Sequence, residues 1–258
     1  MHVEKPSQTA TARAAGALVA WGNAWLSGHV GLDEAVDAVE KSSGPNVMFT
    51  TEAESPLRRG LAELRVDGMT SLRLALPIPG DPLGLTGPPK LNMAAIDAGR
   101  AVIANLGDRC AGLIPAADLR GSSYSGVRWT VLAARPGEPD VPSLPEADHQ
   151  LAMALREATA ALVTVDDVAR GRPEIAGALA ALRDEPASGL APGYPARAHR
   201  VAAQAERLTR VVDLAHGLAG HNLTAEQMRR RAEALRLLDR AVRRAQVAAY
   251  NSAFDPVS

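Results

Sequence analysis

A strand that runs into a loop dense in proline and glycine constrains this chain more than any other stretch. Residues 72–91 read LRLALPIPGDPLGLTGPPKL. Leucine or isoleucine at positions 72, 74, 76 and 78 alternates with other residues, which is typical of a half-buried β-strand. In the loop that follows, each proline fixes φ and removes a backbone donor, while each glycine permits positive φ. We therefore expect a loop of fixed shape that serves either as a binding surface or only as a connection.

The composition limits the classes of function. The chain has 258 residues, of which 47% are hydrophobic, enough for one large domain or two small ones. Its formal net charge of -1 gives no electrostatic footprint for nucleic acid. A single cysteine, Cys110, excludes an intramolecular disulfide and suits a reducing compartment. Polar first residues and the lack of an apolar run of about 20 residues favour a cytoplasmic protein with no membrane partner.

The first part of the chain mixes helical and strand patterns. We expect helices over residues 9–27, 32–41 and 92–98, and one that starts at Ser55-Pro56 with serine as N-cap and proline in the first turn. Strand patterns cover residues 47–50, 72–78, 100–106, 110–115 and 127–131. Gly107-Asp108-Arg109 predicts a β-hairpin between the third and fourth of these strands. The sequence thus predicts an α+β fold with a small antiparallel or mixed sheet of four to five strands and flanking helices.

A proline-rich linker, residues 135–143, precedes an all-α C-terminal half. Capping boxes at Ser143/Glu146 and Thr224/Gln227 predict two helix starts, and the second helix runs to about Tyr250. Further helices are expected over residues 174–183 and 196–218. The short turn at residues 220–222 predicts an antiparallel hairpin of the last two helices. We expect an α+β domain over 1–135 and a helical region over 143–258, and the sequence leaves open whether they pack as one unit.

The sequence offers no motif with the spacing of a catalytic, metal or cofactor site. Gly80 to Gly87 has some likeness to a phosphate-binding loop, but Pro88-Pro89 stands where such a loop requires lysine and serine or threonine. The six histidines form no H-x-x-x-H pair, and one cysteine cannot build a cysteine-rich zinc site. We expect no catalytic residue, no metal and no cofactor.

The last two expected helices carry a surplus of arginine. From residue 197 onward, eleven arginines stand against six acidic residues. At 100° per residue, one helical face about 60° wide carries Arg229, Arg236, Arg240 and Arg243. Pairs such as Glu226 with Arg230 favour a solvated face over a nucleic-acid interface. Arg231 falls in the apolar stripe, so we expect it to reach water or a carboxylate such as Asp213 or Glu206.

Three segments resemble a known group of proteins. Residues 76–89 (LPIPGDPLGLTGPP), 94–102 (AAIDAGRAV) and 112–116 (GLIPA) resemble a pattern of uncharacterised cytoplasmic proteins of actinobacteria. The segments cover the central third of the chain, and the Arg- and Ala-rich composition agrees with such a source. That group has no established activity, so the resemblance implies no catalytic residue here.

The sequence favours a non-catalytic, soluble protein–protein interaction or regulatory protein with an unknown protein partner, and self-association through the C-terminal helices is one form of this function. The first alternative is a small-molecule site or an enzyme at the Leu76–Pro89 loop, with the loops at 122–125 and 189–194 around its mouth. Nucleic-acid binding through the arginine face is the weaker alternative. The candidate binding surface consists of Pro79, Gly80, Asp81, Pro82, Leu83, Tyr124 and Tyr194.

Overall fold

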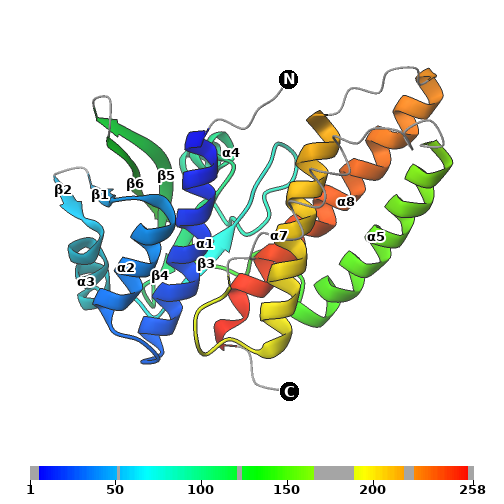
Figure 1. Cartoon of the computed structure of the whole chain (residues 1–258). Helices are drawn as coiled ribbons and strands as arrows, with labels where there is room; N and C mark the ends of the chain where they lie inside the picture. The colour runs from blue at the N-terminus through cyan, green and yellow to red at the C-terminus, as the bar shows by residue number, and fades with distance from the viewer. Residues whose placement is uncertain (1–5, 51–52, 121–123, 166–188, 218–223, 255–258) are drawn as a thin grey trace. The chain divides into compact units, whose positions relative to one another are not determined.

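The computed structural model describes residues 6–50, 53–120, 124–165, 189–217 and 224–254, which fall into two compact units (Figure 1). The unit that we call the sheet unit runs to Val141 and also includes Leu190–Pro195 and the residues from Tyr250 onward. The helical unit includes Pro142–Gly189 and Ala196–Ala249.

The sheet unit is built on a mixed sheet with the strand order β2-β1-β6-β5-β4-β3. Strands β1 and β6 pair in parallel, and all other neighbours are antiparallel. The two longest strands, β5 and β6, form a hairpin in which Cys110 pairs with Ala134 and Arg120 with Tyr124. In chain order the strands are β1 (Asn46–Phe49), β2 (Glu54–Pro56), β3 (Ser71–Ala75), β4 (Ala101–Asn105), β5 (Cys110–Arg120) and β6 (Tyr124–Ala134).

The α+β class and the mixed sheet are confirmed, but the predicted number of strands is wrong. The described residues form six strands, and β2 is the one that was not predicted. Its residues Ser55 and Pro56 were expected to cap and open a helix. Instead they pair with β1, and Pro56 precedes the helix without a side-chain cap. A proline fits there because an edge strand leaves one row of backbone groups unpaired, so its missing N–H costs little.

Two helices cover opposite faces of the sheet. Helix α1 (Pro6–Leu26) packs on β3 to β6 (Figure 1). Gly22 of this helix leaves room for the Leu72 side chain. Helix α4 (Pro89–Ala98) packs on the other face, where Gly112 leaves room for Leu91. Because neighbouring strand residues point to opposite faces of the sheet, each strand presents one set of side chains to α1 and the other set to the face covered by α4. The remaining elements of this unit are α2 (Leu32–Ser43), α3 (Leu57–Val66) and the 3-10 turn Ser252–Phe254.

The helical unit contains α5 (Leu144–Val165), α7 (Ala196–Gly217) and most of α8 (Ala225–Asn251). The capping box of α8 is confirmed, because Thr224 N donates to Gln227 Oε1 (2.9 Å) and Gln227 N donates to Thr224 Oγ1 (3.2 Å). The expected helix at 174–183 and the turn at 220–222 lie outside the described residues, so the helical hairpin stays a prediction. Among the helices that are described, none has the length and apolarity needed to cross a membrane.

Candidate functional site

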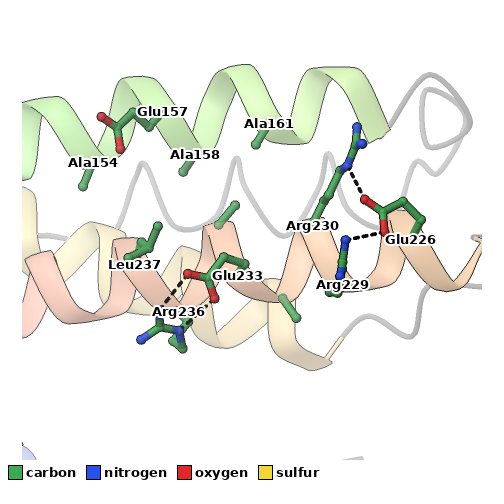
Figure 2. A pocket seen from close by; sticks show the side chains of 12 residues that line it. Ala154, Glu157, Ala158, Ala161, Glu226, Arg229, Arg230, Glu233, Arg236 and Leu237 are labelled. Atoms are coloured by element: carbon green, nitrogen blue, oxygen red, sulfur yellow. Dashed lines mark hydrogen bonds and ion pairs between the residues drawn. The ribbon is translucent and has the colours of Figure 1, made fainter.

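A groove of about 850 Å³ lies between α5 and α8 of the helical unit (Figure 2). Figure 2 shows Ala154, Ala158 and Ala161 of α5 directed toward α8, whose Leu237 points into the space between the helices. The three alanines recur at intervals of four and three residues, so they share one helical face. Ala158 is only 3% exposed, whereas Ala154 and Ala161 are half-buried, so the alanine methyl groups form a recessed apolar wall.

Charged side chains of α8 line the same groove, and they form ion pairs along their own helix. Glu226 accepts from Arg229 Nη2 (2.6 Å) and from Arg230 Nε (2.8 Å). Glu233 accepts two bonds from Arg236, at 2.7 and 3.0 Å. The hydrogen bond from Arg230, followed by that from Arg229, lowers the pKa of Glu226, and the bond from Arg236 lowers the pKa of Glu233. These two glutamates and three arginines therefore form ion pairs beside the apolar wall.

Arginines of the predicted face form ion pairs with acidic residues of the same helix, α8. Arg229 and Arg236 are paired as described above, and Arg243 Nε donates to Asp239 Oδ2 (3.2 Å). Arg240 is exposed on the same helix. Arg231, expected to need water or a carboxylate, donates to the backbone carbonyl of Ala215 in α7 (2.7 Å). Arginines that already bond to carboxylates would have to exchange these partners for phosphates, which weakens the nucleic-acid alternative.

The tip of the Leu76–Pro89 loop is a tight, ordered turn of the sheet unit. Ile78 and Asp81 exchange two backbone hydrogen bonds of 3.0 Å, and Gly80 between them has a φ of 83°. Pro79, Gly80 and Pro82 are exposed, and their role as a binding surface stays a prediction. Leu83 is only 1% exposed and belongs to the core, so it anchors the loop and contributes no binding surface.

The two tyrosines of the predicted surface are held by other segments of the sheet unit. Tyr124 lies at the β5–β6 hairpin with the Arg120 guanidinium 5.7 Å from its ring centre. Tyr194 is buried, and its hydroxyl donates to the carbonyl of Tyr250 (2.9 Å) and accepts from Asn23 Nδ2 (3.4 Å). Burial raises the pKa of Tyr194, because the phenolate would lose its hydration. Tyr194 is therefore a structural side chain.

An ion-pair cluster on β5 and β6 was not predicted. Asp118 is 3% exposed and accepts from Arg120 Nε (3.1 Å) and Arg128 Nη2 (3.3 Å), while Arg120 also donates to both oxygens of Glu54 at 2.7 Å. The hydrogen bond from Arg120 is the main cause that lowers the pKa of Asp118. Positions 118 and 120 alternate along one strand, which places them on one face. Two acids and two arginines balance here, and the cluster joins β2 to the hairpin.

The β3 edge of the sheet is closed to a further strand, which the sequence did not suggest, and the β2 edge is short. At one edge, β2 has three residues and ends in Pro56. At the other edge, Asn23 and Asn251 bind the outward backbone groups of β3 at Leu72 and Leu74. Asparagine inside a helix is a usable signal, because its amide is neutral to unfavourable there unless it has a specific partner.

In the part of the chain that the structure describes, no group of three or more His, Cys, Asp or Glu side chains is placed to hold a metal ion. Cys110 is buried in β5 with a free thiol.

Comparison with known proteins matches both parts of the chain to one family. The N-terminal domain model of Rv1486c-like proteins matches residues 15–143, and the C-terminal domain model matches residues 145–247. Two relatives from Mycobacterium tuberculosis are "Uncharacterized protein Rv1486c" of strain ATCC 25618 / H37Rv and "Uncharacterized protein MT1533" of strain CDC 1551 / Oshkosh. Each is 27% identical over 273 residues, which cover 89% of this chain and 93% of the relative. No solved structure matches.

Proposed function

The chain belongs to the family of Rv1486c-like proteins, and we propose that it is a non-catalytic protein–protein interaction module. Membership confirms the resemblance to an uncharacterised actinobacterial family without an established activity. In this proposal the groove between α5 and α8 binds a helix of a partner protein, a mode in which an apolar helical face enters an apolar groove.

The alanine wall with an exposed leucine beside it is the observation that carries this proposal. Leu237 is 42% exposed in the groove. Small side chains in the groove wall let a second helix approach closely. The ion pairs beside this wall keep the charged side chains of α8 bonded before a partner arrives, so binding need not compensate for isolated charges there.

The alternatives receive less support from the residues on which they were based. Of the side chains predicted around the small-molecule site at the Leu76–Pro89 loop, Leu83 and Tyr194 are buried. The nucleic-acid site relied on arginines of α8, and Arg229 and Arg236 form ion pairs with glutamates one turn away. An added β-strand is disfavoured because the outward groups of β3 at Leu72 and Leu74 are already bonded and β2 is only three residues long and ends in Pro56.

A photo-reactive residue in the groove tests the proposal. Benzoylphenylalanine in place of Leu237 should form an adduct with a defined peptide of a partner when cells that express the full chain are irradiated. The matched control carries it in place of Met93 of α4, which is 65% exposed and therefore more accessible. We expect the adduct at Leu237 only, and we expect Ala161→Glu in the groove wall to remove it. No adduct at Leu237, or equal adducts at both positions, would contradict the proposal.

A further inference from the structure

The charged side chains that line the α5–α8 groove leave a positive charge at one of its ends. Two arginines, Arg229 and Arg230, share the single carboxylate of Glu226 through bonds of 2.6 and 2.8 Å. Figure 2 shows these three side chains together at the end of the groove that lies beyond Ala161. Because one carboxylate balances only one of the two guanidinium groups, this end carries a net charge of about +1 at neutral pH.

A negative charge remains toward the other end of the groove. Glu157 of α5 is exposed and lines the groove near Ala154 (Figure 2). Within the part of the chain that the structure describes, its carboxylate has no hydrogen-bond or ion-pair partner. The other charged pair of the lining, Glu233 with Arg236, carries no net charge. The groove is therefore positive at the end of Arg229 and negative at Glu157, with the alanine wall between them.

If the groove binds a helix, as proposed above, we propose that the partner helix carries an acidic and a basic residue about one turn apart beside its apolar stripe. The acidic residue pairs with Arg229 and Arg230, and the basic residue pairs with Glu157. Glu157 lies four residues before Ala161, which is about 6 Å along the helix axis. Residues three or four apart on the partner share one face and match this rise. Because a reversed helix would bring like charges together at both ends, the order of the two charges fixes the direction in which the helix lies.

These pairs determine direction more than affinity. The side chains of Arg229, Arg230 and Glu226 are 77%, 65% and 48% exposed, so water and salt screen their interactions. An exposed ion pair changes an equilibrium by about two- to fivefold, so two pairs should favour one direction roughly tenfold at low salt. The apolar wall contributes little to this preference, because methyl groups carry no charge. The preference should decrease toward equal use of both directions at about 0.5 M salt, where charges are screened beyond about 4 Å.

Two synthetic helical peptides of identical composition test this direction on the full chain. Both carry leucine at every third or fourth position and benzoylphenylalanine at the first position. One peptide has glutamate four residues before lysine, and the other has lysine four residues before glutamate. After irradiation, mass spectrometry of proteolytic fragments identifies which end of the groove each peptide has labelled. We expect the glutamate-first peptide to label residues 226–230 and the lysine-first peptide to label the turn at Leu237, each by roughly tenfold over the opposite end.

Substitutions of Glu157 show whether the charges cause the preference. Glu157→Gln removes the negative end and should reduce the preference of both peptides to about two- to fivefold, because one pair remains. Glu157→Lys makes both ends positive and should abolish the preference. The matched control is Glu34→Gln, which makes the same chemical change at an exposed position of α2 and should leave the preference unchanged. The two ends are compared within each peptide, so a difference in helix content between the peptides does not affect the result.

The result distinguishes the direction of the helix from the binding of a helix. If both peptides label the same end of the groove, or label both ends equally at low salt, the assigned charge pairing is wrong although the groove still binds a helix. A preference that Glu157→Lys leaves unchanged would overturn the pairing as well. If neither peptide labels the groove at all, the function proposed above is wrong, and the direction of the helix with it.

Discussion

Replacing Gly84 with alanine tests how closely the Pro/Gly loop fits onto the edge strand. Gly84 has a φ of 92°, and an added Cβ would lie 2.8 Å from the Cβ and 2.9 Å from the Cα of Ala75 in β3. A positive φ costs a non-glycine residue about 1–2 kcal/mol. Forcing an extra methyl group into a packed site costs about 1–3 kcal/mol more. We expect Gly84→Ala to lower the free energy of unfolding of the sheet unit by about 2–5 kcal/mol.

A second glycine in the same loop provides the control. Gly80 has a φ of 83°, but no atom lies within 4 Å of its added Cβ, so Gly80→Ala should cost only the conformational part, about 1–2 kcal/mol. Urea unfolding of the full chain, followed by tryptophan fluorescence, measures both variants. The signal reports the sheet unit alone, because Trp21, Trp25 and Trp129 all belong to it. Equal shifts of the two midpoints would refute the close fit at Ala75.

Two further predictions concern buried polar groups of the sheet unit. Asp118 has a lowered pKa, chiefly through its hydrogen bond from Arg120. Its contribution to stability is therefore present above the unfolded-state pKa of about 4, and this contribution disappears as the pH falls through the folded-state pKa. Asp118→Asn should therefore lower the melting temperature at pH 7 and have a much smaller effect near pH 2, and an equal effect at both would contradict this reading. Asn46 is 2% exposed and accepts from Trp129 Nε1 (2.7 Å), so Asn46→Ala should cost about 2–5 kcal/mol in urea unfolding by leaving buried groups unpaired. Asn105→Ala, at an exposed turn, is the control and should cost under about 1 kcal/mol.

The sequence correctly predicted the elements whose structure is determined by residues close to one another in the chain. The turn at Gly107-Asp108-Arg109 joins β4 to β5 as predicted, with Asn105 opposite Cys110. The capping box at Thr224 and Gln227 fixes the start of α8 through bonds between residues three apart. Strand β2 gave no signal, because three residues carry no periodic pattern and Pro56 is rare in strands. Its pairing is decided by β1, which lies earlier in the chain.

The features that close the sheet depend on distant parts of the chain. Asn23 is 49 residues from Leu72, and Asn251 is 177 residues from Leu74. No periodicity or spacing rule connects such positions. A single sequence therefore shows that an asparagine lies in an expected helix, but it does not predict which backbone groups the asparagine binds. Leu83 and Tyr194 show the converse error. Both lie in segments rich in proline and glycine, and the loop composition suggested exposure although large apolar side chains commonly anchor a loop to its core.

The two units offer a partner different surfaces, and this difference is the reason for placing the proposed binding site in the α5–α8 groove and not at the edge of the sheet. The sheet unit satisfies the backbone groups of its edge strand with its own asparagines, so a partner would have to break four hydrogen bonds before it could form any there. The α5–α8 groove requires no such step, since its apolar wall and exposed Leu237 make few bonds that binding would break. Substitutions in the groove should therefore change binding more than stability, whereas substitutions at Asn23 should change stability first. A groove variant that unfolds the helical unit as strongly as it weakens binding would show that the alanine wall is part of the core.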